Sequence, residues 1–227
     1  MMKITYIGQA GLYIEVDDTK ILIDPYLSNS VAAVQPANYR RVEVDERFLS
    51  IQPDYILLTH SHLDHLDPET LKHYLHEGSH VTVLSPTSAW QQVRTYPGAN
   101  NYVCFNAGTT WSTPTIQFRA VVAEHSDPDA IGIIITIDGK NYYVTGDTLY
   151  SERVFDSLPD IEYEAVFLPI NGKGNNMNHI DASLFARRVC ARYSVPMHVG
   201  MFDEMSAEIF DCPTRLIPTI YQPIIFD

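Results

Sequence analysis

The stretch Thr59-His60-Ser61-His62-Leu63-Asp64-His65 places four side chains of metal-ligating type within six positions. Imidazole nitrogens and a carboxylate are ligands that proteins use for Zn, Mn or Fe. The chain has only nine histidines in 227 residues, so three of them within six positions are not expected by chance. The stretch therefore predicts a site for one or two divalent transition metals.

The residues before this stretch predict how its side chains are presented. Residues 54–59 form a nearly continuous apolar run, which is typical of a strand buried on both faces. In an extended chain, residues two apart point the same way, so His60 and His62 should face one point. Asp64 and His65 follow as the chain turns and can face a second point nearby. One short loop can therefore serve two metals roughly 4 Å apart.

Other strands and helices are predicted on both sides of this loop. β-Branched and apolar runs predict strands over residues 3–7, 12–16, 20–23, 81–84, 115–123, 131–137, 141–145, 165–168 and 197–199. Asp138-Gly139 is a hairpin turn signal. Helices are predicted over residues 67–77, with Asp67 as the cap and Pro68 in the first turn, and over 87–95, 152–158 and 182–193.

The segment from Tyr26 to Pro53 is a long polar connection between predicted strands. Connections of this length are usually functional or disordered. Its aromatic residues and Pro36 favour an ordered segment over a free linker. We predict that it folds over the metal site or forms part of a subunit contact; the alternative is a mobile surface excursion.

The order of these elements predicts the fold class. Strands dominate early and then alternate with helices, which indicates an α/β (α+β) protein with two sheets and helices packed outside, a four-layer αββα sandwich. At 227 residues the chain is long enough for one sizeable core, so we expect a single domain, 1–227.

The pattern His-x-His-x-Asp-His after a hydrophobic strand resembles the signature of the metallo-β-lactamase-fold hydrolases. The resemblance implies four further site residues in a set order, each at the end of a predicted strand. They are Asp24 in Ile-Leu-Ile-Asp-Pro, His125 in Ala-Glu-His-Ser, Asp147 in Gly-Asp-Thr and His198 in Pro-Met-His-Val.

The resemblance also implies a division of roles. His60, His62 and His125 would bind one metal, Asp64, His65 and His198 the other, and Asp147 would bridge both. Catalysis would use a metal-bound hydroxide, which Asp64 orients before it carries the proton toward the leaving group. Asp24 would fix the tautomer of a ligating histidine from behind.

Several longer strings are similar to the L-ascorbate-6-phosphate lactonase-like branch of these hydrolases. They are Asp24-Pro25-Tyr26-Leu27-Ser28, Asp64-His65-Leu66-Asp67-Pro68-Glu69-Thr70, Leu168-Pro169-Ile170-Asn171-Gly172, Asn176-Met177-Asn178 and Pro196-Met197-His198. This similarity implies hydrolysis of a lactone or a sugar-phosphate-type small molecule. A metal-dependent phosphodiesterase and a non-hydrolytic metal-binding protein on the same fold remain as alternatives.

The loop of residues 171–179 allows two interpretations. Its glycines and asparagines suit an ordinary turn, with Asp181 capping the next helix. Alternatively Lys173, Asn178 or His179 contacts the substrate, and Lys173 is the best candidate for holding an anionic group. His73, His76 and His80 match no ligand of the family, and the first two are interpreted as solvated residues on a helix.

Composition excludes some classes of partner. The formal net charge of −13 disfavours nucleic acid and anionic membranes, which attract basic proteins. No apolar run approaches the roughly 20 residues of a membrane span, and the N-terminus does not resemble a signal peptide. We expect a cytoplasmic protein with a small-molecule substrate, leave a homo-oligomer open, and interpret Cys104, Cys190 and Cys212 as reduced cysteines without a metal role.

Overall fold

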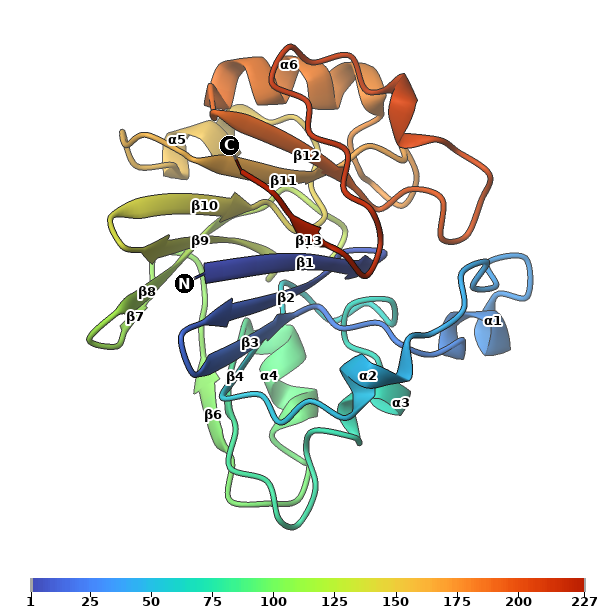
Figure 1. Cartoon of the computed structure of the whole chain (residues 1–227), viewed down its shortest axis with the longest axis vertical. Coiled ribbons are helices and arrows are strands. Elements are labelled where there is room, and N and C mark those ends of the chain that lie inside the picture. Colours follow the sequence, from blue (N-terminus) through green and yellow to red (C-terminus); the bar gives the residue numbers. More distant parts are fainter. Residues whose placement is uncertain (1, 227) are drawn as a thin grey trace. The chain divides into compact units, whose positions relative to one another are not determined.

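The computed structural model describes residues 2–226 and contains two β-sheets with helices (Figure 1). The chain divides into two compact units. Unit 1 comprises residues 2–104, Gly200–Glu204 and residues 218–226, and unit 2 comprises Phe105–Val199 and Met205–Ile217. The prediction of a mixed α/β fold with two sheets is confirmed, whereas the single domain stays a prediction.

Unit 1 contains a seven-stranded sheet in the order β13-β1-β2-β3-β4-β5-β6. Its strands are β1 (Met2–Gly8), β2 (Gly11–Val16), β3 (Thr19–Ile23), β4 (Tyr55–Leu57), β5 (Thr82–Ser85), β6 (Asn101–Cys104) and β13 (Pro223–Ile224). Its helices are α1 (Ser30–Val34), α2 (Glu46–Leu49), α3 (Pro68–Leu71) and α4 (Thr87–Val93). The apolar run before His60 becomes β4, which pairs in parallel with β3 and β5 and is therefore an interior strand, as its composition predicted.

Unit 2 contains a six-stranded sheet in the order β12-β11-β10-β9-β8-β7. Its strands are β7 (Thr110–Ser112), β8 (Ile116–Val122), β9 (Ile131–Ile137), β10 (Lys140–Val144), β11 (Ala165–Pro169) and β12 (Tyr193–Met197). Its helices are α5 (Glu152–Ser157), α6 (His179–Val189) and the 3-10 turn η1 (Ala207–Ile209). Helix α6 packs on β11 and α5 on β8, which covers one face of this sheet and buries Phe185 (Figure 1).

Two predicted helices have different bounds in the structure. Asp67 accepts the backbone N–H of Glu69 and caps α3 as predicted, but α3 ends at Leu71. The chain then continues in turns, because the N–H groups of His73 and Tyr74 bond to carbonyls three residues back. The prediction of a regular helix over 67–77 is therefore wrong.

Helix α6 begins three residues before the predicted start. Asn178 caps it by accepting the N–H groups of Ile180 and Asp181, so Asp181 lies in the first turn and the prediction that it is the cap is wrong. Cys190, with a φ of 58°, ends the helix in a left-handed conformation. The chain then enters β12, an edge strand of the sheet, where Pro196 is tolerated. The predicted strand at 197–199 therefore lies too late in the sequence.

Strands β6, β7 and β13 were not predicted. All three are short, and each forms one end of a sheet. None of the three cysteines forms a disulfide within residues 2–226. No helix within residues 2–226 is both long and apolar enough to cross a membrane.

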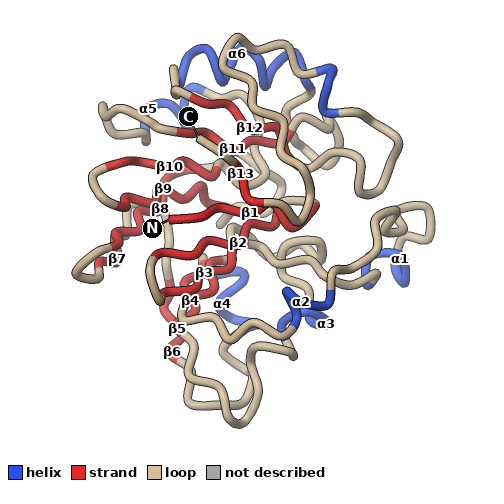
Figure 2. Tube along the Cα trace, in the orientation of Figure 1, coloured by secondary structure: helices blue, strands red, loops and turns tan. Residues whose placement is uncertain are grey.

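The segment of residues 26–53 is ordered within unit 1 and carries α1 and α2; Figure 2 shows it mostly as loop. The Arg40 side chain fixes this segment by three hydrogen bonds. It donates to the carbonyls of Tyr26 and Val42, each at 2.7 Å, and to the Tyr221 hydroxyl at 2.6 Å. The Arg41 backbone N–H bonds to the carbonyl of Met201. A covering role over a metal site, or a subunit contact, stays a prediction.

These contacts lead to a prediction about proteolysis. Trypsin should cut the bond between Arg40 and Arg41 slowly, because the Arg40 side chain and the backbone on both sides of it are hydrogen-bonded. Arg40→Ala should speed cleavage after Arg41 at least severalfold, whereas Arg94→Ala, on an exposed position after α4, should leave it unchanged. Mass spectrometry of timed digests measures both rates. Rapid cleavage of the unaltered, metal-loaded protein, with activity and oligomeric state preserved, would show that the segment is a mobile excursion.

Candidate functional site

The histidine-rich loop of unit 1 follows directly from β4. The backbone N–H groups of His65 and Leu66 both bond to the carbonyl of His62, which turns the chain back toward His60. The His60 Nε2 and His62 Nδ1 atoms lie 2.9 Å apart, and both residues face one point as their spacing predicted. His60 and His65 are fully buried, and their rings lie 4.0 Å apart by centroid. The loop therefore gathers its imidazoles in one place.

Asp24 supports this loop from behind. It follows β3 with a φ of 42°, and its side chain is fully buried. One carboxylate oxygen accepts the Thr59 backbone N–H at 2.8 Å, and the other lies 2.8 Å from His65 Nδ1 and accepts the Thr59 hydroxyl. The Asp24 contact at Nδ1 favours the tautomer in which His65 Nε2 carries the lone pair.

Gln9 contacts the histidine-rich loop and was not among the residues predicted from the sequence. It lies in the turn between β1 and β2, is 1% exposed, and donates from Nε2 to Asp64 Oδ2 at 2.7 Å. The Asp64 side chain itself is 18% exposed, and its Oδ2 lies 3.8 Å from His65 Nε2. Asp64 is thus partly accessible to solvent and is held on one side by an amide.

Unit 2 brings together the three downstream residues. Asp147 follows β10, is 5% exposed, and is preceded by Gly146 with a φ of 61°. Its Oδ2 lies 3.2 Å from His198 Nε2 and 3.9 Å from His125 Nε2. His198 comes after β12 with a φ of 57°, in a region that residues other than glycine rarely adopt. Such conformations cost about 1–3 kcal/mol each and are typical of functional sites.

The loop of residues 171–178 supports this second cluster. The carbonyl of Asn175 lies 3.2 Å from His125 Nδ1, and the side chain of Asn176 donates to Asp147 Oδ2 at 2.8 Å. Sequence analysis singled out this loop but not these two residues, because a run of asparagines gives no sign of which one turns inward. Asn176 is buried, while Asn175 is exposed.

The three tentative substrate-binding residues lie around the start of α6. Lys173 is exposed in the loop, and His179 is half-buried at the first position of the helix. The Asn178 side-chain oxygen caps α6, and its amide lies 2.9 Å from Asp181 Oδ2. Asn178 therefore has a structural role, and contact of any of the three with a substrate stays a prediction. His73, His76 and His80 are exposed.

The donor chemistry of each unit fits a divalent transition metal. The histidine-rich loop of unit 1 and the three downstream residues of unit 2 supply histidine and aspartate side chains that could hold a metal ion. Neutral imidazole and carboxylate ligands accept Zn, Mn and Fe. The buried Asp24–His65 pair in unit 1 and the Asn175 carbonyl at His125 in unit 2 are the supports that ligating histidines normally have at their second ring nitrogen.

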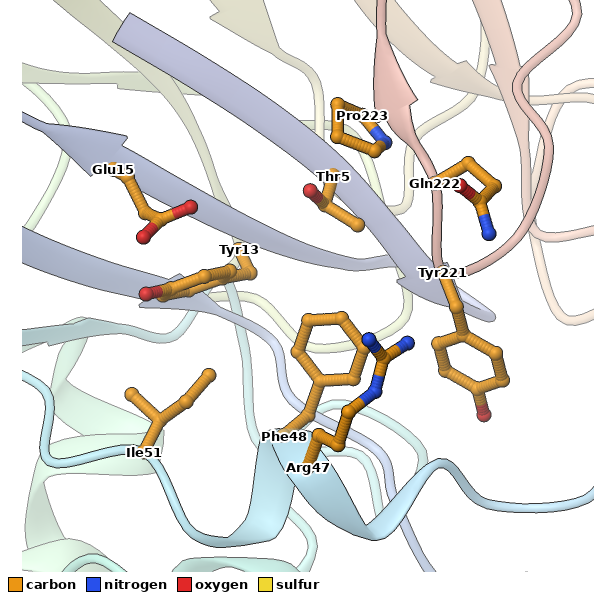
Figure 3. A pocket seen from close by; sticks show the side chains of 9 residues that line it. All are labelled: Thr5, Tyr13, Glu15, Arg47, Phe48, Ile51, Tyr221, Gln222 and Pro223. Atoms are coloured by element: carbon orange, nitrogen blue, oxygen red, sulfur yellow. The ribbon is translucent and has the colours of Figure 1, made fainter.

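A separate cavity of about 320 Å³ lies in unit 1 and includes none of the predicted site residues. Figure 3 shows Tyr13, Phe48, Tyr221 and Arg47 among the side chains that line it. The Phe48 ring stacks on Tyr221 at 5.5 Å and meets Tyr13 edge-on at 5.8 Å. Helix α2 of the 26–53 segment thus packs against β2 and against the turn before β13 through aromatic side chains.

Comparison with known proteins assigns the family. Residues 19–199 match the family model of the β-lactamase superfamily domain. The chain is 30% identical over 219 residues to a UPF0173 metal-dependent hydrolase of Staphylococcus epidermidis, a match that covers 88% of this chain and 87% of the relative.

Solved structures agree on the fold. A possible metal-dependent hydrolase from Veillonella parvula gives a TM-score of 0.79 at 18% identity and covers 99% of both chains. An isothiocyanate hydrolase from Delia radicum gut bacteria gives 0.77 at 19% identity, again over 99% of both. At these identities the likeness shows the fold alone, so membership rests on the family model and the sequence relative. The chain belongs to the β-lactamase superfamily and, within it, to the UPF0173 metal-dependent hydrolases.

Proposed function

We propose that this chain hydrolyses a lactone or a sugar-phosphate-type small molecule by metal-dependent activation of water. The single observation that carries the proposal is the buried Asp24–His65 pair, whose atoms lie 2.8 Å apart next to three other ligand-type side chains. A buried carboxylate behind a histidine is a common support of a metal ligand. Family membership supports a hydrolytic role for such a site.

The proposed ligands follow the division of roles that the family resemblance implies. His60, His62 and His125 are assigned to one metal, Asp64, His65 and His198 to the other, and Asp147 to both. When bound, a divalent metal lowers the pKa of a water ligand toward about 7 and polarises the bond to be cleaved. Zn or Mn is the expected metal, and Fe is the third choice that this ligand set accepts.

The residues of the chain have distinct tasks in this scheme. Asp24 holds the proton on His65 Nδ1 and so keeps Nε2 available. Asp64 is the carboxylate with access to solvent, and it is assigned to orient the water, accept its proton and deliver that proton to the leaving group. Lys173 is the proposed contact for an anionic part of the substrate, with Asn178 and His179 beside it.

The substrate class rests on the lactonase-like strings around Asp24, Asp64 and Asn176. A metal-dependent phosphodiesterase is the second candidate, since two metals suit a phosphoryl group equally well. A non-hydrolytic metal protein is the third, because one fold hosts many chemistries. A neighbour described as a diiron β-hydroxylase, CmlA from Streptomyces venezuelae, supports keeping the third candidate open.

Metal analysis and a substrate panel test the proposal together. Protein purified without chelator should contain one or two equivalents of Zn, Mn or Fe by elemental analysis. Protein loaded separately with Zn and Mn is then assayed on lactones and on phosphodiesters, and lactone hydrolysis is the expected result. Cleavage of phosphodiesters alone would favour the second candidate. A folded preparation that is active without any such metal would contradict the proposal.

Location and partners remain predictions. The net charge of −13 supports the absence of nucleic-acid and membrane partners, and cysteines without disulfides are compatible with the proposed cytoplasmic location. A homo-oligomer is still open, and sedimentation of the metal-loaded protein would decide it.

A further inference from the structure

We propose that two amide side chains, Gln9 in unit 1 and Asn176 in unit 2, are positioning residues for the carboxylates of Asp64 and Asp147. Each amide donates one hydrogen bond to one carboxylate oxygen and thereby fixes the rotation of that carboxylate for metal binding. The inference rests on the proposed function, because it assigns both carboxylates to the metal centre.

Gln9 is buried and hydrogen-bonded in the turn between β1 and β2. Its Nε2 lies 2.7 Å from Asp64 Oδ2, its side chain is 1% exposed, and its φ is 53°. The Tyr6 hydroxyl donates to the Gln9 carbonyl at 3.0 Å and fixes the backbone. A Cβ at Gly11 would lie 3.0 Å from the Gly8 carbonyl and 3.2 Å from that of Asp24, so the turn is tightly packed against the strand end that carries Asp24.

The backbone conformation of Gln9 adds to this argument. Glutamine has no special tolerance for a positive φ, unlike glycine or asparagine, so this conformation costs free energy. Strain of this kind persists where the surrounding structure imposes it and is concentrated at functional sites. A glycine in this place would relieve the strain but would lose the hydrogen bond to Asp64.

Asn176 has the same relation to Asp147. Its Nδ2 lies 2.8 Å from Asp147 Oδ2, and the residue is 5% exposed. The backbone of the next residue is fixed by two hydrogen bonds, since Met177 donates to the carbonyl of Thr148 at 2.9 Å and Gly172 donates to that of Met177 at 3.0 Å. The loop therefore delivers this amide to Asp147 in one orientation.

The chemical type of the two donors is the reason for the assignment. An amide N–H is neutral, so it orients a carboxylate without cancelling the negative charge that attracts a cation. A lysine or arginine in the same place would form an ion pair and compete with the metal. Two sequence-distant amides in the same relation to the two proposed carboxylate ligands therefore indicate positioning of the ligands.

Co²⁺ binding to metal-free protein tests the proposal without a substrate. Gln9→Met and Asn176→Leu keep the size of each side chain and remove the donor. Partners that orient metal ligands typically contribute about 10- to 100-fold to metal affinity. Each variant should therefore raise the Kd for Co²⁺ by about 10- to 100-fold and change the visible absorption spectrum of the bound Co²⁺. Thermal unfolding of the metal-free variants gives the purely structural effect separately.

The controls are a second substitution and a matched amide. Gln9→Leu removes the same donor with a branched apolar side chain and adds no charge, so it should weaken Co²⁺ binding as well, even if Gln9→Met folds poorly. Asn141 accepts from Thr136 and donates to the Glu162 carbonyl in unit 2, and Asn141→Leu should leave the Co²⁺ affinity and spectrum unchanged.

The outcomes separate this inference from the proposed function. If the unaltered protein binds Co²⁺ and the Gln9 and Asn176 variants bind it equally well with the same spectrum, the positioning role is wrong and the proposed metal site stands. If Asn141→Leu weakens binding as much as Asn176→Leu, the effect is a general loss of structure and the positioning role is again wrong. If the unaltered protein binds no Co²⁺, both are wrong.

Discussion

His198→Ala should lower the turnover of the metal-loaded enzyme by about a hundredfold or more, the range typical for loss of a strong catalytic interaction. His198 is 9% exposed, and its Nε2 lies 3.2 Å from Asp147 Oδ2. Removing the imidazole should empty the second metal position in the proposed scheme. Initial rates on the lactone or phosphodiester that the unaltered protein cleaves, together with metal content per chain, measure both effects.

The backbone at this position requires a second variant. The φ of His198 is 57°, which alanine adopts at a cost of about 1–2 kcal/mol. His198→Asn removes the imidazole with a residue that tolerates this conformation, so it should lose metal and turnover without that cost in stability. His73→Ala, at an exposed position after α3, should change turnover by less than about twofold. Similar losses at His198 and His73 would show that His198 is not a metal ligand.

The interior strands could be predicted because their patterns are local. Each of β1, β3, β9 and β11 is an apolar, β-branched run bounded by turn residues, and the pattern alone identifies it. The hairpin between β9 and β10 was also visible, since Asp138 and Gly139 adopt the positive φ values of 51° and 75° that this dipeptide favours. The order of the residues that follow these strands agrees with the family resemblance, which implied His125, Asp147 and His198 as further site residues. Their role as metal ligands stays a prediction.

Helix ends were predicted less well because several residues near the start of a helix can each serve as its N-cap. Asn178 and Asp181 are both good capping residues, and sequence alone gives no reason to choose the earlier one. The edge strands were missed because they are short and partly exposed, so they carry little apolar pattern.

The supporting amides could not be predicted for a different reason. Gln9 lies 55 positions from Asp64, and Asn176 lies 29 positions from Asp147. Nothing in a Gly-Gln-Ala-Gly turn or an Asn-Asn pair shows which distant carboxylate the amide will reach, because that depends on strand register. Asp24 could be predicted because it follows a predicted strand in the string Ile-Leu-Ile-Asp-Pro, which resembles the pattern of the family.

Asp24→Asn should weaken metal binding by about 10- to 100-fold, as expected for a partner that orients a metal ligand. The substitution keeps the volume of the buried side chain, and asparagine tolerates the φ of 42° at this position. The side-chain oxygen of the introduced asparagine can still accept the Thr59 backbone N–H. The metal-free protein should therefore remain folded, and Zn²⁺ titration against a chelating dye measures the loss of affinity.

The effect is expected because the substitution changes the preferred tautomer of His65. Asp24 accepts a hydrogen bond from His65 Nδ1 at 2.8 Å, which leaves the Nε2 lone pair for a metal. With the asparagine amide nitrogen facing Nδ1, that atom must become the acceptor, so the proton moves to Nε2, the atom that should bind metal. Nitrogen-15 chemical shifts of His65 in the metal-free protein would report the tautomer.

Asp17→Asn is the matched control, because Asp17 has a similar φ of 51° but is exposed in the turn between β2 and β3. Unchanged Zn²⁺ affinity in Asp24→Asn, with the His65 proton on Nε2, would show that His65 does not bind the metal through Nε2.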